Sequence, residues 1–389
     1  MSDAPSYDVI VVGVGAMGAA TCWSLARRGV RVLGLEQFDI PHTQGSSHGY
    51  SRMTRTSYYE HPDYVPLLRR ANVLWRELEE DSGEKILHLV GGLYVGKPGE
   101  GLVPGALRSA RQHGLRHELL DRSELARRFP QFEVPDDWCG MLEPEAGFIL
   151  PELSISSFVT GALRRSAEIH GHEAVLSWHA EASGVRVVTA RQTYRAERII
   201  FTGGAWSSRL VRDLGVELVV TRQVLGWVWP KTPAAFEAGA LPVWMVDRLD
   251  GTLYYGFPMM TQSPGLKLAL HAPMRPTEPD RVDREVTPED EETFRPCLRR
   301  FLPSANGPLL ALRTCLYTNS PDGHFIIDRH PQHDRVLFAA GFSGHGFKFA
   351  SVVGEVLADL AQNGATRQPV GFLGLQRLTG TRAATSVRI

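Results

Sequence analysis

Three glycines near the start of the chain have the spacing of a site for nucleotide phosphates. Gly13, Gly15 and Gly18 follow the apolar run Tyr7-Asp8-Val9-Ile10-Val11-Val12, and helix-forming residues continue to Arg28. In such a turn the first glycine allows a tight bend, the second lets the backbone approach a pyrophosphate, and the third lets helix and strand pack closely. The start of the helix then offers free N–H donors to the phosphates.

An acidic residue follows this turn at a suitable distance. A second apolar strand is expected over residues 30–35 and ends in Glu36, 18 residues after Gly18. A carboxylate there can accept a hydrogen bond from a ribose hydroxyl. A glycine pattern alone is weak evidence, because glycine-rich turns also occur for packing alone. The order strand, turn, helix, strand and acid predicts a dinucleotide site.

Composition limits the class of protein. The chain has 389 residues, 43% of them hydrophobic and 22% charged, which predicts an ordinary globular protein of two or three domain-sized units. The net charge of −1 gives no reason to expect nucleic acid or an anionic membrane as a partner. Four scattered cysteines without metal spacing predict a reducing compartment and no metal site. Without an apolar stretch of spanning length, a soluble cytoplasmic protein is expected.

A polar loop over residues 41–49 leads to two arginines. Because it leaves the carboxyl edge of the expected parallel sheet, this loop lies where ligands bind in doubly wound folds. Arg52 and Arg55 are three residues apart and would share one face of a helix. Most arginine pairs form solvated surfaces. With no acidic partner expected nearby in the sequence, we favour anion binding here.

Strand and glycine-turn patterns recur far along the chain. One ends at Gly203 and Gly204, and another runs from residue 336 into the glycines of 341–346. This recurrence predicts one sheet built from separate parts of an α/β (α+β) chain. The expected Rossmann-like domain comprises 1–90, 150–215 and 320–389. The expected inserted domain, an antiparallel sheet with a helical acidic patch at 280–292, comprises 91–149 and 216–319. Helices are expected over 66–80, 107–128 (with breaks), 153–170, 207–214 and 350–360.

Several separated stretches resemble one family. They are the glycine turn with Glu36; Gly45-Ser46-Ser47-His48-Gly49 followed by Arg52 and Arg55; Tyr255-Gly256-Phe257-Pro258 with Lys267 and His271; Thr314-Cys315-Leu316-Tyr317-Thr318; and Gly341-Phe342-Ser343-Gly344-His345-Gly346-Phe347-Lys348. The chain resembles the monomeric sarcosine oxidase and N-methyltryptophan oxidase family of flavoproteins, within the D-amino-acid-oxidase-like group. The resemblance extends over nearly the whole chain, to about Leu378.

The resemblance implies FAD, held covalently through the Cys315 sulfur on the flavin 8-methyl carbon. Taken alone, Cys315 would be read as a small buried residue. The implied cofactor-binding residues are Gly13, Gly15, Met17, Gly18, Glu36, Ser46, His48, Arg52, Gly203, Cys315, Gly344, Gly346 and Lys348.

The resemblance also implies roles around a substrate. Arg55 and Lys348 would bind its carboxylate, while His271 and Tyr255 would lie beside its amine. Lys267 maps to a lysine that activates oxygen, Arg52 to a cation beside the flavin and His48 to a neighbouring loop position. Residues 267, 269 and 271 alternate on one strand face, so Lys267 and His271 are expected to point to the same side. Alone, Lys348 would be read as a surface lysine and His271 as a core histidine.

The activity implied is oxidation of a secondary amino acid, either N-methyl or cyclic, such as sarcosine. Hydride passes to the flavin, the imine is hydrolysed, and O₂ is reduced to H₂O₂. The resemblance also implies a monomer. Two alternatives stay open: a dehydrogenase with another electron acceptor, and a flavin-binding protein without turnover. An NAD dehydrogenase would explain the first motif only.

The chain departs from its relatives around the arginines, where Tyr50-Ser51 and Thr56-Ser57-Tyr58 differ from the usual residues. It also departs between Pro258 and Lys267, where the segment 259–264 makes it one residue longer. Sarcosine, N-methyltryptophan and pipecolate all remain candidate substrates.

Overall fold

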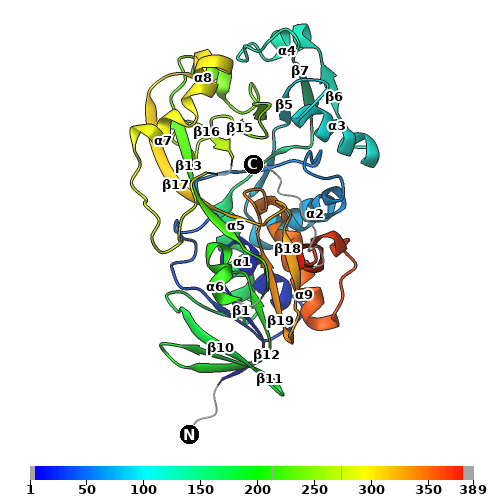
Figure 1. Ribbon diagram of the computed structural model, residues 1–389, viewed down its shortest axis with the longest axis vertical. Coiled ribbons are helices and arrows are strands. Elements are labelled where there is room, and N and C mark those ends of the chain that lie inside the picture. Colours follow the sequence, from blue (N-terminus) through cyan, green and yellow to red (C-terminus); the bar gives the residue numbers. More distant parts are fainter. Residues whose placement is uncertain (1–4, 212–213, 273, 380–389) are drawn as a thin grey trace.

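The computed structural model describes residues 5–211, 214–272 and 274–379, which form two large sheets and a small one (Figure 1). In these residues the first sheet has the order β10-β11-β12-β1-β2-β9, with β19 beside β12 and β18 beside β19. Its strands are β1 (Ser6–Val12), β2 (Val32–Leu35), β9 (Glu168–His170), β10 (Val175–Glu181), β11 (Gly184–Thr189), β12 (Thr193–Phe201), β18 (Ile326–His330) and β19 (His333–Ala340).

Parallel pairing joins distant parts of the chain in this sheet. β1 pairs in parallel with β2 and β12, and β12 pairs in parallel with β19. The prediction of one sheet assembled from separate segments is therefore confirmed. Because both faces of the central strands are covered, these strands read as apolar runs and not as alternating patterns.

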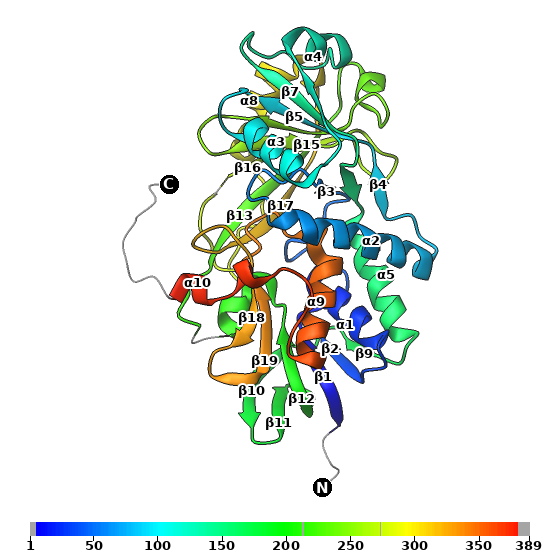
Figure 2. The same ribbon diagram turned by 90° about the vertical axis from the view of Figure 1, so that its right-hand side faces the viewer.

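Four helices pack together over one side of this sheet (Figure 2). They are α1 (Ala16–Ala26), α2 (Tyr64–Ser82), α5 (Pro151–Leu163) and α9 (Ala350–Asn363). α1 is buried on nearly every side, which suits its small residues. α2 buries the stripe Leu67, Ala71, Leu74 and Leu78, as its helical spacing predicts.

The second sheet lies at the other end of the molecule (Figure 1), and in the described residues its order is β17-β13-β16-β15-β14-β5-β7-β6. The strands are β5 (Gly92–Gly96), β6 (Glu118–Leu120), β7 (Cys139–Glu143), β13 (Val219–Val228), β14 (Val243–Asp247), β15 (Leu253–Gly256), β16 (Leu266–His271) and β17 (Leu309–Asn319). The pairs are antiparallel except β14 with β5, where two separate insertions of the chain meet.

A small third sheet lies between the two large ones (Figure 2). It joins β3 (Arg52–Thr54), β8 (Gly147–Ile149) and β4 (Leu87–Leu89). β8 comes from the expected inserted domain and pairs with strands from the other expected domain, so this sheet ties the two together. The division into two domains stays a prediction, and its residues 1–4 and 380–389 lie outside the described ones.

Some expected helices are shorter than predicted. In place of the expected helix 107–128, α3 (Leu102–His113) begins earlier and ends at Gly114, which has φ 61°, and β6 precedes α4 (Arg122–Arg128). The expected helix 153–170 ends with α5, and the chain turns through Ser166 at φ 64° into β9.

The helical part of the acidic patch is α7 (Pro288–Glu292), followed by α8 (Arg295–Phe301). The expected helix 207–214 is α6 (Ser207–Leu210), and residues 212–213 lie outside the described ones.

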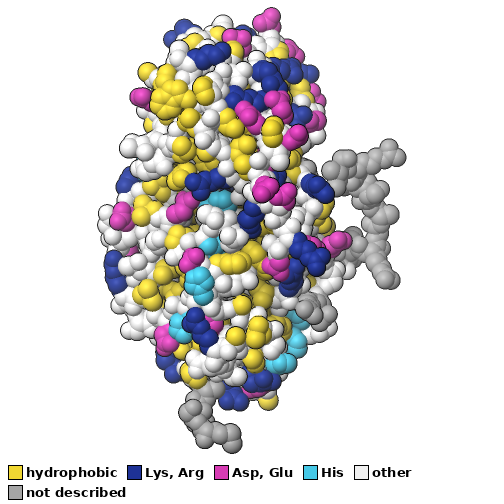
Figure 3. Space-filling view, turned by 90° about the vertical axis from the view of Figure 1, so that its left-hand side faces the viewer, with side chains coloured by type: hydrophobic (Ala, Val, Ile, Leu, Met, Phe, Trp, Pro, Cys, Tyr) yellow, Lys and Arg dark blue, Asp and Glu magenta, His cyan; other side chains and the backbone are white. Residues whose placement is uncertain are grey.

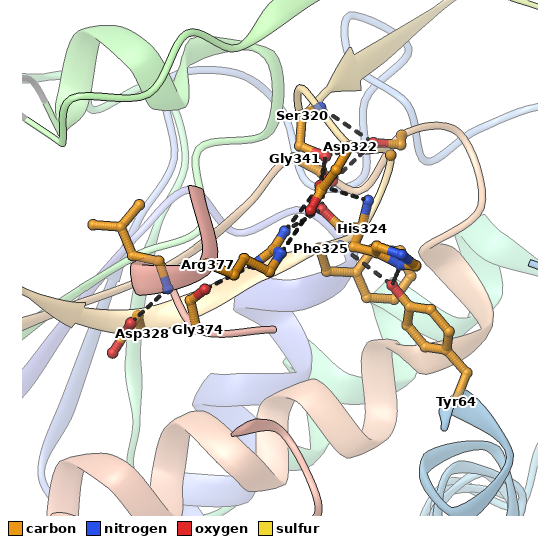
Figure 4. Close-up of polar contacts among 12 residues, drawn as sticks. Tyr64, Ser320, Asp322, His324, Phe325, Asp328, Gly341, Gly374 and Arg377 are labelled. Atoms are coloured by element: carbon orange, nitrogen blue, oxygen red, sulfur yellow. Dashed lines mark hydrogen bonds and ion pairs between the residues drawn. The ribbon is translucent and has the colours of Figure 1, made fainter. Parts of the chain in front are cut away.

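The C-terminal end of the described chain is fastened to the turn 320–324 (Figure 4). Arg377 in α10 (Gln376–Thr379) donates to both carboxylate oxygens of Asp322, at 2.8 and 3.1 Å, and to the carbonyl of His324 at 3.0 Å. His324 in turn contacts the Tyr64 hydroxyl at 3.2 Å. The turn is thereby held between α10 and α2.

The surface carries charges of both signs. Figure 3 shows Lys and Arg side chains interspersed with Asp and Glu over one face, with hydrophobic side chains among them. In the described ranges, none of the helices is both long and apolar enough to cross a membrane.

Candidate active site

A cavity of about 320 Å³ opens where the glycine turn, β2, β12 and β19 end. This is the carboxyl edge of the parallel strands, where doubly wound folds bind ligands. The predicted cofactor-binding residues in its lining are Gly13, Gly15, Met17, Glu36, Ser46, Arg52, Gly203, Gly344 and Gly346.

The three glycines of the turn meet three different surroundings. A Cβ on Gly13, which has φ +91°, would lie 2.7 Å from the Thr202 carbonyl oxygen, and one on Gly18 would lie 1.8 Å from the Gly13 oxygen. A Cβ on Gly15 would meet no atom within 4 Å. Gly13 therefore bends, Gly18 packs, and Gly15 leaves room over the N-terminus of α1.

Glu36 holds this turn and borders the cavity. One of its carboxylate oxygens accepts from the Val14 N–H at 2.8 Å and the other from the Phe38 N–H at 3.1 Å. Burial raises the pKa of Glu36, against the opposing effect of these hydrogen bonds. Each oxygen keeps a further lone pair that a ligand hydroxyl can use.

A second cavity, of about 70 Å³, adjoins the first. Arg52, Tyr317, Gly344 and Phe347 line both. Residues predicted from distant parts of the sequence meet around this small cavity, namely Arg52, Arg55, Tyr255, His271, Cys315 and Lys348.

Arg52 and Cys315 lie together at the junction of the cavities. Arg52 lies on β3, so it does not share a helix face with Arg55, and its Nη2 donates to the Ser46 carbonyl at 2.6 Å. The same nitrogen is 3.7 Å from the Cys315 Sγ. Cys315 is buried on β17, and its sulfur also lies 3.7 Å from the Ser46 carbonyl oxygen. The thiol thus faces a cation in a water-poor setting.

Arg55 has an acidic partner, contrary to the expectation from the sequence. Its Nη2 donates to Glu60 Oε1 at 2.5 Å, and its guanidinium lies 4.2 Å from the centroid of the Tyr58 ring. Burial, the largest single effect, raises the pKa of Glu60, but the charge and hydrogen bond of Arg55, together with the charges of His345 and Lys348, lower that pKa to about 2. Among the described residues, Arg55 Nη1 and Glu60 Oε2 are buried without hydrogen-bond partners.

Lys348 is a second buried cation at this cavity. Its Nζ donates to the His345 carbonyl at 2.7 Å. Burial, and then the charge of Arg55, lowers the pKa of Lys348 well below its ordinary value. His345 Nε2 lies 3.0 Å from the Gly323 carbonyl oxygen, so Nε2 carries the proton and Nδ1 accepts from the Tyr58 hydroxyl at 2.5 Å.

His271 faces two tyrosines. Its Nδ1 lies 3.2 Å from the Tyr317 hydroxyl, and its ring lies edge-on to that of Tyr255 with centroids 6.5 Å apart. Burial lowers the pKa of His271 to about 4, so the imidazole is neutral at pH 7 and available as a hydrogen-bond acceptor.

Three predicted residues line neither cavity. Gly18 is used in packing. Lys267 lies on β16, four residues before His271 on the same strand face, but its Nζ donates to the carbonyls of Gly49 and Ser51 at 2.8 and 2.7 Å. His48 is buried with neither ring nitrogen bonded to a described residue, and burial followed by the charge of Arg52 lowers its pKa to about 3.

Comparison with known proteins decides the family. The family model DAO, described as FAD dependent oxidoreductase, matches residues 8–360. The chain belongs to this family.

Two relatives and a solved structure match nearly all of this DAO-family chain. A monomeric sarcosine oxidase of Streptomyces avermitilis is 42% identical over 382 residues, which cover 97% of this chain and 100% of the relative. An N-methyl-L-tryptophan oxidase of Yersinia pestis is 34% identical, with coverages of 95% and 99%. The structure of NikD, an unusual amino acid oxidase essential for nikkomycin biosynthesis, aligns with a TM-score of 0.82 at 27% identity, covering 95% of this chain and 97% of NikD.

The large cavity fits the FAD that the DAO family uses. It combines the open backbone at Gly15, the first N–H groups of α1 and a buried carboxylate at Glu36. At its far end Gly344 approaches Tyr317 so closely that a Cβ would lie 2.3 Å from the tyrosine ring. No group of His, Cys, Asp or Glu side chains in the described residues is arranged to hold a metal ion.

The structure adds lining residues that the sequence reasoning missed. Glu60 comes five residues after Arg55, and Tyr317 follows Cys315 by two positions on one strand, so its side chain falls on the same face. These spacings were available in the sequence. His345 lies between the predicted residues Gly344 and Gly346, but its contacts with Gly323 and Tyr58 join distant segments and have no signal in local spacing.

Proposed function

We propose that this FAD-dependent oxidoreductase oxidises a small secondary amino acid, N-methyl or cyclic, such as sarcosine, with O₂ as the electron acceptor. The observation that carries the proposal is the small cavity, where two buried cations face a neutral imidazole directly beside the end of the large cavity. The names of the sarcosine oxidase and N-methyl-L-tryptophan oxidase relatives support this substrate class.

Arg55 and Lys348 would bind the substrate carboxylate. Among the described residues, Arg55 Nη1 has no hydrogen-bond partner, and Lys348 Nζ donates to the His345 carbonyl alone. Both side chains therefore retain N–H donors for an anion. Glu60 balances the charge of Arg55, and a bound carboxylate would favour the protonated form of Lys348, whose pKa burial lowers. Charge-assisted hydrogen bonds from two sides fix the substrate's orientation as well as its position.

His271 and Tyr255 would face the substrate amine. A protonated amine has no lone pair to assist loss of hydride from the neighbouring carbon. A neutral imidazole accepts the hydrogen bond of the amine and favours its uncharged, oxidisable form. Because burial keeps His271 neutral, the ring can do this at physiological pH.

FAD, when bound, accepts two electrons and a hydrogen from the C–H bond next to nitrogen and passes them on to O₂. Of the chain's own residues, Cys315 would hold the flavin 8-methyl carbon through a thioether, and Arg52 would lie beside the flavin. Lys267 would supply the positive charge that oxygen needs when it accepts electrons. We further propose a cytoplasmic monomer.

The test is anaerobic mixing of the purified protein with sarcosine, N-methyltryptophan, pipecolate and proline while the flavin absorption is followed. The small volume of the cavity predicts bleaching by sarcosine and slower or no bleaching by N-methyltryptophan. Admitting O₂ should restore the colour and form one H₂O₂ per flavin. If none of the four bleaches the flavin, the proposed substrate class is wrong. If colour returns with a quinone dye but not with O₂, the protein is a dehydrogenase.

A further inference from the structure

The turn formed by Gly49, Tyr50 and Ser51 separates the half-buried carboxylate of Glu152 from the buried ammonium of Lys267. On one side the Gly49 N–H donates to Glu152 Oε1 at 2.6 Å, and the Tyr50 N–H lies 3.2 and 3.3 Å from the two oxygens of the same carboxylate. Both residues have left-handed backbones, with φ 98° and 69°. Successive N–H groups in such a turn form a concave anion site, which Glu152 fills.

On the other side the carbonyls of the turn bind Lys267. Its Nζ donates to Gly49 O at 2.8 Å and to Ser51 O at 2.7 Å, with Ser51 Oγ at 3.3 Å. The side chain is 1% exposed, and the nitrogen lies 4.7 Å from the centroid of the Phe257 ring. Two carbonyl dipoles and aromatic faces therefore replace the water shell of this ammonium.

Glu152 acts on Lys267 through the turn. The N–H of Gly49 donates to the carboxylate of Glu152, and the C=O of Gly49 accepts from the ammonium of Lys267. Each hydrogen bond polarises the backbone groups of Gly49 and so strengthens the other. Glu152 is fixed in the first turn of α5, where a helix N-terminus favours a carboxylate. Tyr50 is a non-glycine residue in a left-handed conformation, which persists when surrounding contacts over-determine it.

We propose that Glu152 is a positioning residue for the oxygen half of the reaction, because it fixes the turn that keeps Lys267 in place and charged. Glu152 touches neither substrate nor oxygen. The inference rests on the proposed function, in which O₂ takes two electrons and two protons and leaves as H₂O₂. Lys267 keeps its proton throughout and acts by its charge.

The experiment compares Glu152→Gln, Glu152→Ala and Lys267→Met in the flavin-loaded protein. The control is Glu145→Gln, which removes an exposed carboxylate seven residues before Glu152. Reduction by sarcosine without oxygen and reoxidation by O₂ are timed separately. Glu152→Gln should slow reoxidation roughly tenfold, because Lys267 is then held less firmly and a misplacement of about 1 Å can slow a reaction by up to about a hundredfold. Glu152→Ala should slow it further, while reduction changes less than about twofold, because the carboxylate-binding wall is untouched. The control should match the natural protein in both steps.

A second measurement reports on Lys267 without turnover. With ¹³Cε-labelled lysine, the Lys267 signal is the one missing from Lys267→Met. At neutral pH the natural protein should show a charged amine and Glu152→Gln a shift toward the neutral form. Burial, and then the charge of Arg52, lowers the pKa of Lys267 well below its ordinary value, and the charge of Glu152 opposes them. Arg52, Cys315 and His48, the other charged or titratable groups acting on Lys267, are the same in both proteins.

The outcomes separate two failures. If Lys267→Met reoxidises slowly but both Glu152 variants behave naturally in the kinetics and the spectrum, the role of Glu152 is overturned and the proposed function stands. If Lys267→Met reoxidises at the natural rate, the oxygen role of Lys267 is wrong and the inference falls with it.

Discussion

Cys315 has its sulfur 3.7 Å from a guanidinium nitrogen of Arg52 and 3.7 Å from the Ser46 carbonyl oxygen. From its residue type alone, it is a small buried side chain. Its neighbours come from chain segments more than 260 residues away in sequence, so their combination with the thiol is a property of the fold. The thioether stays a proposal, which the place of the sulfur beside Arg52 in the lining of the small cavity supports.

We expect Cys315→Ser to bind FAD without a covalent bond. The glycine turn and Glu36 are unaffected, so the cofactor still binds. Acid precipitation should leave flavin with the pellet for the natural protein and in the supernatant for the variant. Release of flavin from both proteins would contradict the covalent link.

Lys348→Met should weaken substrate binding more than flavin reduction at saturation. Loss of a charged hydrogen bond is worth about 1.5–3 kcal/mol, so KM for sarcosine should rise roughly tenfold to a hundredfold. Lys348→Arg is the matched control that keeps the charge. Steady-state kinetics measures both parameters, and an unchanged KM in Lys348→Met would remove this lysine from the carboxylate site.

Sequence predicted which side chains surround the small cavity better than it predicted their partners. The family motifs imply that Arg55, His271 and Lys348 surround one site, and in the structure all three line the small cavity. The contact of Arg55 with Glu60 was missed, because no acidic partner was expected nearby and the chain between these two residues has no regular period that would bring them together. Lys267 donates to backbone carbonyls that are oriented by the left-handed conformations of Gly49 and Tyr50. In the sequence, only the glycine indicates such a conformation.

At the scale of elements, the glycine turn offers a matched pair of substitutions. Gly18→Ala places a methyl group against the Gly13 carbonyl, so the free energy of unfolding should fall by about 1–3 kcal/mol with or without FAD. Gly15→Ala meets no protein atom, so the apoprotein should lose less than about 1 kcal/mol, but FAD should bind more weakly.

Calorimetry with and without FAD distinguishes the two variants. Equal effects on the apoprotein would contradict the distinct surroundings of Gly15 and Gly18.

Elements with a long apolar period were predicted well, and short edge strands were not. The first strand follows from its apolar run, α1 from its helix-forming residues after the glycine turn, and α2 from its helical spacing. β6 and β9 have three residues each, too few to show a period. Both lie at a sheet edge, β6 beside the next strand β7 and β9 beside the distant strand β2. The single parallel pair in the second sheet likewise depends on which insertions meet, and local sequence does not encode that.

For the whole molecule, three buried histidines predict steep destabilisation in acid. Burial lowers the pKa of His48 and of His345 to about 3 and that of His271 to about 4. The unfolded rings have pKa values near about 6.5, so below that pH the unfolded chain binds protons that the folded protein does not. The full contribution of these histidines to the free energy of unfolding is present above about pH 6.5. As the pH falls toward about 4, that free energy declines by about 1.4 kcal/mol per pH unit for each histidine.

Urea unfolding at several pH values between 8 and 4 measures this slope. The variant His48→Asn should lose one histidine's share of it. An unchanged slope would mean that His48 does not contribute to the acid sensitivity.

The strand order of the first sheet also bears on how the protein is made. β1 emerges first from the ribosome, yet its neighbour β12 follows only at residues 193–201, and β19 closes beside β12 only at residues 333–340. Parallel strands that are far apart in the sequence pair slowly, because the chain loses entropy in closing a large loop before the strands gain any contacts. The nascent chain therefore carries an unfinished nucleotide site for most of its synthesis. Because the last strands complete the cavity, we expect FAD to bind only near the end of translation. Nascent chains stalled before residue 333 should therefore fail to retain FAD.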